Sequence, residues 1–154
     1  MKVKNVLMLL AITLMCGQFA VAQNALNDKA DNIVGIYESV QNGDRFRAKI
    51  EKLKDGTYRG QIIWMEKDKN KDGSKILDTK NPDKSLRNTP ADRIVIFSGL
   101  KYDGKDHEWG GTKIYDPQRG VKAKMTASFA ADGRLKITGS VLLISESVYW
   151  NKIN

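Results

Sequence analysis

The regular alternation of apolar and polar side chains is the feature that most constrains how this chain can fold. Between residues 44 and 53, Phe46, Ala48 and Ile50 fall on one face of the segment and charged side chains fall on the other. Residues 121–129 repeat this pattern. Because successive side chains of a strand point to opposite faces, a period of two residues predicts strands that each have one buried face.

Eight segments carry this strand signal, and turns rich in glycine, aspartate and asparagine join most of them. Asp55-Gly56 and Asp132-Gly133 supply the positive φ that a tight hairpin requires. The predicted strands are residues 33–40, 44–53, 57–64, 93–100, 108–115, 121–129, 135–141 and 147–153. Since closing a meander of hairpins removes its exposed edges, we predict an all-β fold with one eight-stranded antiparallel up-and-down β-barrel. A two-sheet sandwich is the alternative.

One long segment, residues 66–92, interrupts the alternation because it is polar and poor in β-branched residues. Its composition predicts a loop, and loops of this length are often functional lids, with disorder as the rival interpretation. Asn81-Pro82-Asp83 is typical of a helix start with Asn81 as the cap. It predicts one or two helical turns that end near Arg87.

The N-terminus has the three-part pattern of a secretory signal peptide. Lys2 and Lys4 precede an apolar run, and Ala20-Val21-Ala22 forms a small-x-small cleavage site. The run is shorter than the roughly 20 residues that span a bilayer. Lipid attachment at Cys16 is disfavoured because Met15 stands where a small side chain is normally required. We predict a signal peptide over residues 1–22, an N-terminal extension over 23–32 and a barrel domain over 33–154.

The charge and cysteine content restrict the location and the partners. Export implies a periplasmic or secreted protein, and Cys16 is the only cysteine, so the mature chain forms no internal disulfide. The formal net charge is +8, but the basic residues are scattered as on the solvated face of strands. We expect no nucleic-acid partner and no membrane span, whereas weak attraction to anionic lipid or polysaccharide is left open. The oligomeric state is not predicted.

Two polar motifs are candidates for a metal site or a catalytic site. Asp68, Asn70 and Asp72 match the first half of a calcium loop, but Thr79 stands where a bidentate glutamate is expected, so a solvated turn is the favoured interpretation. His107 is the only histidine and has no identified nucleophile. We therefore predict no catalytic residue and no cofactor.

The aromatic side chains give the candidate ligand-binding residues, because inward aromatics line pockets in barrels. Filling of the core is the competing interpretation for each ring. Gly110 and Gly111 predict a bulge or a bend. The alternation puts Trp109, Lys113 and Tyr115 on one face. If this face points inward, Lys113 is the polar tip of a pocket, and if it points outward, the hairpin carries an exposed aromatic patch. The candidates are Trp64, Trp109, Lys113, Tyr115, Arg87 and Trp150.

Several ordered landmarks together resemble the DUF2147 family of bacterial exported proteins. They are Gly35-Ile-Tyr37, Gly60-Gln-Ile62, Asn81-Pro-Asp83 with Leu86-Arg87, the block from Trp109 to Gly120, and Trp150. The resemblance implies a lipocalin-like β-barrel and no activity. It also implies a closed barrel base with Tyr37 beneath Lys152 of the last strand. The chain departs from the family pattern at Tyr37, where the family usually has tryptophan, at Ala123, where it has an aromatic, at Asn88-Thr89-Pro90, and at Thr138-Gly139-Ser140.

Three functional hypotheses follow from these observations. The leading one is an exported barrel that binds a small apolar or amphipathic ligand. The second is a barrel with a solid core that binds an envelope partner through its outer face or its long loop. The third is an enzyme, for which the sequence shows no catalytic motif.

Overall fold

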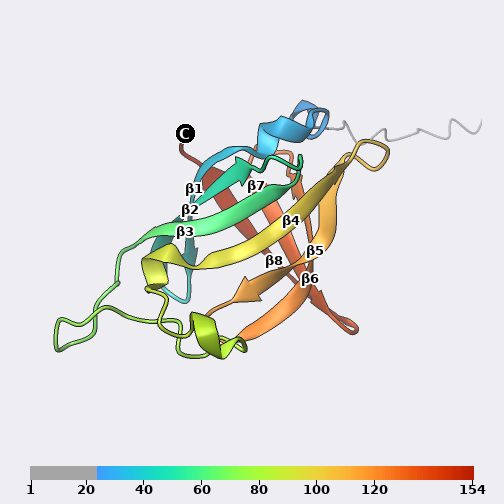
Figure 1. Ribbon diagram of the computed structural model, residues 1–154. Coiled ribbons are helices and arrows are strands. Elements are labelled where there is room, and N and C mark those ends of the chain that lie inside the picture. Colours follow the sequence, from blue (N-terminus) through green and yellow to red (C-terminus); the bar gives the residue numbers. More distant parts are fainter. Residues whose placement is uncertain (1–23) are drawn as a thin grey trace, which may run out of the picture.

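The computed structural model describes residues 24–154, which form a closed antiparallel barrel with strand order β1-β2-β3-β4-β5-β6-β7-β8 (Figure 1). The predicted eight-stranded barrel is confirmed, and the sandwich is not formed. The strands are β1 (Gly35–Gln41), β2 (Asp44–Lys52), β3 (Tyr58–Met65), β4 (Val95–Asp103), β5 (Glu108–Asp116), β6 (Val121–Phe129), β7 (Leu135–Val141) and β8 (Ile144–Lys152).

Four short 3-10 helices accompany the strands, and one of them corrects the predicted helix start. They are η1 (Ala25–Asn27), η2 (Ala30–Ile33), η3 (Lys84–Leu86) and η4 (Ala91–Arg93). The cap of η3 is Asp83, whose carboxylate accepts from the Ser85 N–H, rather than Asn81. Asn81 is buried instead, and its side chain accepts from the Asp83 N–H and donates to Asp78.

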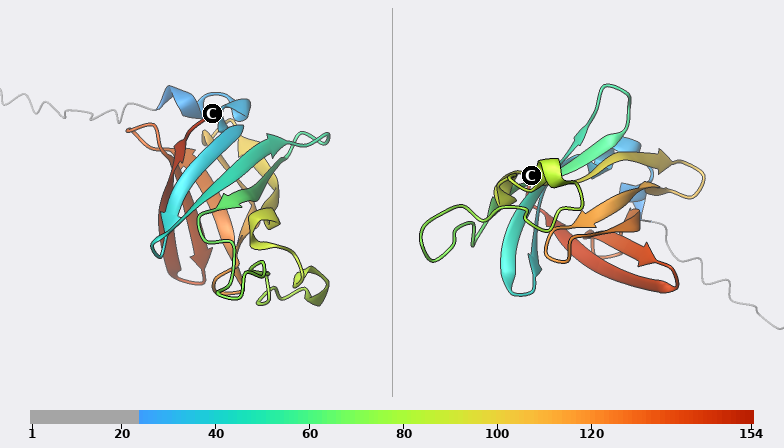
Figure 2. Two further views of the ribbon diagram at one scale, coloured as in Figure 1. Left: turned by 90° about the vertical axis from the view of Figure 1, so that its left-hand side faces the viewer. Right: turned by 60° about the horizontal axis from the view of Figure 1, so that its bottom comes forward.

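The N-terminal turns cover one end of the barrel, which we call the closed end (Figure 2, left). Three buried or half-buried rings reach them: Trp109 Nε1 donates to Ala30 O at 3.0 Å, Tyr37 Oη donates to Ile33 O at 2.8 Å, and Tyr102 Oη donates to Asn27 O. Residues 24–32 of the predicted N-terminal extension are therefore part of the barrel's packing, because the carbonyl oxygens of Asn27 and Ala30 satisfy hydroxyl and indole groups that burial would otherwise leave without partners.

Lys152 of β8 completes the closed end in the arrangement that the family resemblance implies. Its Nζ donates to Asn32 O at 2.9 Å and lies 5.8 Å from the centre of the Tyr37 ring. Burial lowers the pKa of the Lys152 ammonium group. The expected pairing of Tyr37 with a basic residue of the last strand is confirmed, with a structural rather than a ligand-binding role.

The hydrophobic core fills the half of the barrel that adjoins the closed end. Trp109 is completely buried, and it packs edge-on against Phe129 and at a tilt against Tyr102, with ring centres 5.8 and 5.0 Å apart. Met125, Leu100, Ile50 and Leu135 are equally buried. These large side chains thus lie in the half of the barrel that adjoins the closed end.

The other end of the barrel, the open end, carries the β1–β2, β5–β6 and β7–β8 turns and the long loop between β3 and β4 (Figure 2, left). The loop spans residues 66–94 and lies against the outside of the barrel. Its anchor is Asp78, which is buried and accepts from Tyr115 Oη at 2.6 Å and from Asn81 Nδ2 at 2.7 Å. Two hydrogen bonds to one buried carboxylate hold the loop in place.

The predicted signal peptide, residues 1–22, lies outside the described residues. Within residues 24–154, no helix has the length and apolar character needed to cross a bilayer.

Candidate functional site

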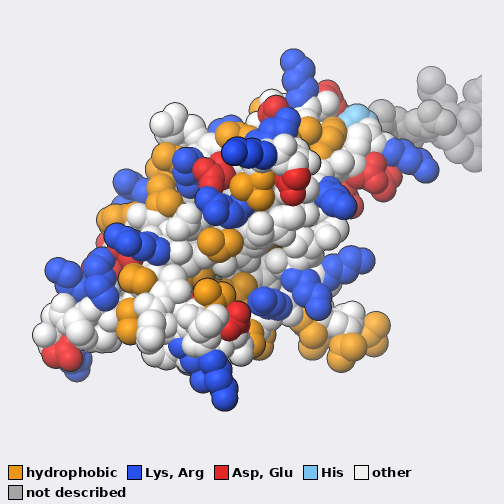
Figure 3. Space-filling model, viewed as in Figure 1, with side chains coloured by type: hydrophobic (Ala, Val, Ile, Leu, Met, Phe, Trp, Pro, Cys, Tyr) orange, Lys and Arg blue, Asp and Glu red, His pale blue; other side chains and the backbone are white. Residues whose placement is uncertain are grey.

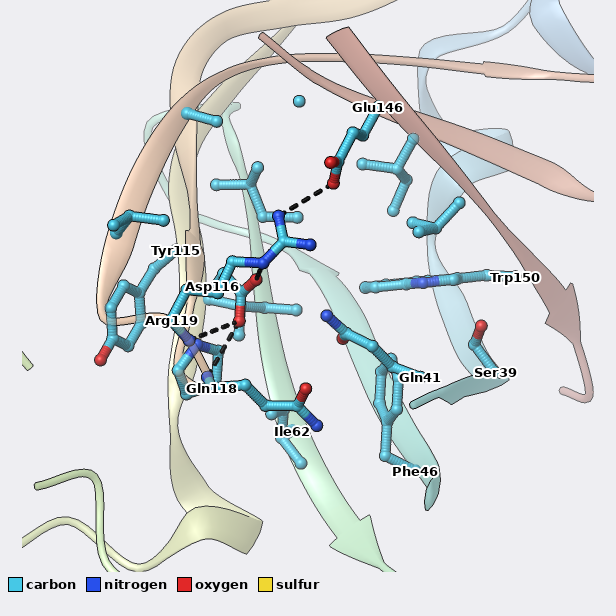
Figure 4. A pocket seen from close by; sticks show the side chains of 18 of the residues that line it. Ser39, Gln41, Phe46, Ile62, Tyr115, Asp116, Gln118, Arg119, Glu146 and Trp150 are labelled. Carbon is cyan, nitrogen blue, oxygen red and sulfur yellow. Dashed lines mark hydrogen bonds and ion pairs between the residues drawn. The ribbon is translucent and has the colours of Figure 1, made fainter. Parts of the chain in front are cut away.

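A cavity of about 450 Å³ opens at the open end of the barrel (Figure 4). Residues of all eight strands line it, and its inner wall is aliphatic and aromatic. Phe46 and Trp150 stand edge to face, with ring centres 5.7 Å apart. Ile62, Ile96, Ile114 and Ile137 complete this wall. An apolar cavity of this size is in the range of small-molecule sites.

The cavity exists because small side chains occupy the inward positions of neighbouring strands. Ala123 of β6 lies between Ile114 and Gly139, and a Cβ on Gly139 would come 3.3 Å from the Ala123 Cβ. At the equivalent rows nearer the closed end, Met125 and Trp109 fill the interior. The interior of the barrel is therefore filled by side chains in the half near the closed end and hollow in the half near the open end.

Polar groups gather at the mouth of the cavity rather than along its wall. Arg119, in the β5–β6 turn, donates to Glu146 Oε2 at 2.9 Å, and its Nε lies 3.6 Å from Asp116 Oδ2. The hydrogen bond to Glu146 raises the pKa of Arg119, so the guanidinium group stays charged. All three side chains are partly solvated. They offer one cation and two carboxylates to the polar part of a ligand.

The local sequence explains why Arg119 reaches the mouth. Asp116 Oδ1 accepts from the Gln118 and Arg119 N–H groups, and the Gly120 N–H donates to Asp116 O at 2.8 Å. Gly120 has a φ of 71°, and a Cβ there would lie 2.5 Å from Lys80 O. Asp116 and Pro117 thus begin the turn between β5 and β6, and the close approach of the long loop requires its glycine.

Two of the six predicted ligand-binding residues border the cavity. Trp150 is buried and contributes its ring to the wall. Tyr115 borders the cavity too, but its ring points away from Trp150 toward the long loop, where its hydroxyl donates to Asp78 (Figure 4). Burial and the hydrogen bond to Asp78 raise the pKa of Tyr115. Its hydroxyl is used for anchoring the loop.

Two bulges change the face that side chains occupy. One places Trp64 on the outer face instead of the inner face, and the other leaves Trp109 on the face opposite Lys113. Between β2 and β3, Ala48 pairs with Ile62 and Arg47 pairs with Trp64, so Ile63 is an extra residue. Trp64 consequently lies on the outer face, 37% exposed, under the Arg47 guanidinium at 4.9 Å. Trp109 points inward but belongs to the closed end.

The bulge predicted at Gly110-Gly111 is confirmed, and it decides where Lys113 points. The register shifts between Trp109 and Thr112, and Gly111 has a φ of 80°. One inserted residue turns the following side chains to the opposite face. Lys113 and Tyr115 are therefore on the face of the sheet opposite Trp109, where Lys113 is exposed and Tyr115 is buried beneath the long loop. The expectation that all three share one face is wrong.

Arg87 also lies away from the cavity. It follows η3 in the long loop, where its Nε donates to Asn81 O at 2.8 Å. Arg87 is a candidate from the sequence because it belongs to the Leu86-Arg87 motif. Its hydrogen bond shows that it stabilises the long loop instead.

The predicted calcium ligands point to other partners. Asp68 accepts from Lys75 Nζ at 2.7 Å, and Asp72 accepts from the Ser74 N–H at 2.9 Å. The Asn70 amide donates to Ser74 Oγ. Across residues 24–154, no three histidine, cysteine or acidic side chains converge as a metal site would require. His107 lies in the β4–β5 turn, 3.4 Å from Asp28 and at the end opposite the cavity.

Glu146 and Ile144 line the cavity but lie outside the last strand predicted from the sequence, which begins at residue 147. In the structure β8 begins at Ile144. The sequence does contain the signal for these residues. Every second residue from Ile144 to Trp150 lines the cavity, namely Ile144, Glu146, Val148 and Trp150. Extending the period of two backward from Trp150 finds them.

Comparison with known proteins supports the fold. The model of the DUF2147 family, uncharacterised proteins conserved in bacteria, matches residues 26–152. The structure of protein HP1028 from the human pathogen Helicobacter pylori, which belongs to the lipocalin family, is similar with a TM-score of 0.61 and 23% sequence identity, over 79% of this chain and 82% of that chain. At this identity the similarity shows the fold alone. No curated protein matches the chain.

Proposed function

Because the chain belongs to the DUF2147 family, whose members are uncharacterised, we propose a function from the cavity itself: the protein binds a small apolar or amphipathic ligand inside the barrel. The observation that carries the proposal is the apolar cavity of about 450 Å³ with one open end. The lipocalin-like fold supports it by analogy. A barrel with a solid core, the second hypothesis, would have no such space.

The distribution of polar groups sets the orientation of the ligand. An apolar part would enter first and contact Trp150, Phe46 and the isoleucine wall. A polar end would remain at the mouth beside Arg119 and Glu146. Ligand sites commonly combine an apolar wall with a few polar groups that fix orientation.

The test uses a fluorescent apolar probe such as anilinonaphthalene sulfonate, with a medium-chain fatty alcohol as the competitor. We expect Ala123→Phe to abolish probe binding, because Ala123 faces the cavity and a phenyl ring there occupies the space. Ala131→Phe is the matched control, since Ala131 is exposed in the turn at the closed end. Unchanged probe binding in Ala123→Phe, with the protein folded by circular dichroism, contradicts the proposal.

Export is the second part of the proposal. It is supported by the lysines, the apolar run and the small-residue site within residues 1–22. Intact-mass measurement of protein isolated from its host should give a chain that begins at Gln23. A mature chain that still carries residues 1–22 would exclude cleavage at this site.

A further inference from the structure

The tip of the β7–β8 hairpin is the most exposed apolar feature of the described chain. The tip consists of Val141, Leu142, Leu143 and Ile144, and the two leucines are 97% and 101% exposed. Figure 3 shows the tip as orange side chains that project from the barrel at the lower right. Contiguous exposed apolar side chains mark interaction sites more often than single ones do.

The backbone conformation of the tip does not favour leucine, so the formation of the turn does not explain these two residues. Leu142 has a φ of 55°, a conformation in which two-residue hairpins favour glycine or asparagine. The β1–β2 hairpin at the same end of the barrel meets this requirement with Asn42-Gly43, at φ values of 50° and 83°. A position that breaks a local rule without a structural gain points to a functional demand.

Lysines without carboxylate partners lie on the outer wall beside the tip. Lys113 of β5 pairs across the sheet with Lys124 of β6, and Lys124 pairs with Ser140, the residue before the tip. Lys122 is two residues nearer the open end, and all three lysines are exposed. Within residues 24–154 none of them forms an ion pair. Like charges placed opposite each other are unfavourable, and a negatively charged surface would relieve this.

We propose that this hairpin tip docks the protein on an anionic lipid bilayer, with the leucines in the acyl boundary and the three lysines against the headgroups. A projecting tip of four consecutive exposed apolar side chains suits a fluid apolar phase, which needs no complementary shape. The neighbouring positive charge matches the negative surface potential of anionic lipid. Apolar insertion and electrostatic attraction act together because both lie on the same side of the barrel.

Docking in this way places the mouth of the cavity at the lipid surface. Val141, Leu142 and Ile144 belong both to the tip and to the cavity lining. If the proposed ligand binding is correct, an amphipathic ligand would pass between bilayer and barrel along an apolar path. This last step rests on the proposed function, whereas the docking itself does not.

The experiment is flotation of the purified mature protein with two kinds of vesicle, phosphatidylcholine alone and phosphatidylcholine mixed with phosphatidylglycerol. We expect binding to the anionic vesicles that weakens strongly at about 1 M salt, where the Debye length falls to about 3 Å. The double variant Leu142→Gly/Leu143→Ser should lower vesicle binding at least about tenfold. Its Gly-Ser pair suits the turn, so its melting temperature should not fall.

Three further variants make the outcome decisive. Leu26→Ser, at the closed end and 40% exposed, is the matched control and should bind vesicles as the original protein does. The double variant Lys122→Gln/Lys124→Gln should weaken binding to the anionic vesicles and leave any binding to the phosphatidylcholine vesicles unchanged. Ala123→Phe should leave vesicle binding unchanged, which separates docking from occupation of the cavity.

Absence of vesicle binding overturns the proposal, and so does equal binding by the Leu142→Gly/Leu143→Ser variant. A tip that instead joins two copies of the chain would give a dimer that this variant dissociates, with no vesicle binding, and that result also overturns it. The single variant Leu143→Ser, at a tip residue that does not line the cavity, should weaken vesicle binding and still bind the apolar probe in solution, so the docking proposal and the cavity proposal can fail independently.

Discussion

The two ends of this barrel are built from the same eight strands but differ in what fills them. At the closed end, Trp109, Tyr37 and Phe129 occupy the interior, and carbonyl oxygens of the N-terminal turns accept hydrogen bonds from the Trp109 indole and the Tyr37 hydroxyl. At the open end, Ala123 and Gly139 leave a cavity of about 450 Å³, and Val141 and Ile144 are apolar but exposed.

This difference separates stability from binding within one fold. Large buried rings contribute much of the apolar area that folding removes from water, and Trp109, Tyr37 and Phe129 supply this area at the closed end. The open end can remain hollow because its strands continue from a packed base. We therefore expect substitutions at the closed end to act on the free energy of unfolding and substitutions at the open end to act mainly on binding.

The largest expected effect is at the centre of the closed end. Trp109→Ala should lower the free energy of unfolding by about 3–5 kcal/mol, because it leaves a cavity beside Phe129 and removes the indole bond to Ala30 O. Chemical denaturation monitored by circular dichroism measures this. Ile144→Ala at the open end, where the side chain is 70% exposed, should change stability by only about 0.5 kcal/mol. Equal losses in the two variants would remove the distinction between the ends.

A smaller, pH-dependent effect is expected at Tyr37. Burial raises the pKa of the Tyr37 hydroxyl above the value of about 10 that it has in an unfolded chain. The folded protein holds this proton more tightly, so the stabilisation is complete below about pH 10 and is lost as the pH rises further. Tyr37→Phe should cost about 1 kcal/mol at pH 7, because the hydroxyl no longer donates to Ile33 O.

The measurement is the free energy of unfolding of both proteins between pH 7 and alkaline pH. The difference between the original protein and Tyr37→Phe should narrow above about pH 10. Tyr149→Phe, on the partly exposed outer face, controls for the loss of a hydroxyl. If the difference in the free energy of unfolding stays constant with pH, burial does not raise the pKa of the Tyr37 hydroxyl.

The smallest expected effect is a gain at the open end. Leu142→Gly should raise the free energy of unfolding by about 0.5–1 kcal/mol, because glycine takes a φ of 55° without the steric cost that leucine has. Asn42→Gly is the comparison, and little gain is expected there because asparagine tolerates this conformation. Thermal unfolding of both variants measures the gains. A loss of stability in Leu142→Gly would mean that the leucine side chain contributes to the fold itself.

Much of the fold could be predicted from the sequence because its signals are local. The alternation in residues 121–129 and 135–141 gave these two strands with their observed bounds. Asp55-Gly56 and Asp132-Gly133 marked turns whose glycines have φ values of 83° and 82°. Strand ends were less certain where polar residues continue a strand, as in β8, which begins three residues before the prediction.

The candidate site was predicted less well because it depends on the parity of side chains along bulged strands. A period of two residues assigns faces correctly only while the register is unbroken. The extra residue at Ile63 moved Trp64 outside, and the bulge at Gly110-Gly111 did the same to Lys113. Only Trp150 and Tyr115 among the six candidates border the cavity.

The sequence by itself determined the strands and the turns between most of them, since period and turn chemistry depend on neighbouring residues, and it favoured a closed barrel over a sandwich. The tertiary structure alone decided which half of the barrel is filled, where Tyr115 finds its partner in Asp78, and that Arg119 and Glu146 meet at the mouth of a cavity. These contacts join residues 27 or more positions apart in the chain. Their geometry depends on bulges and on barrel closure, which no single segment specifies.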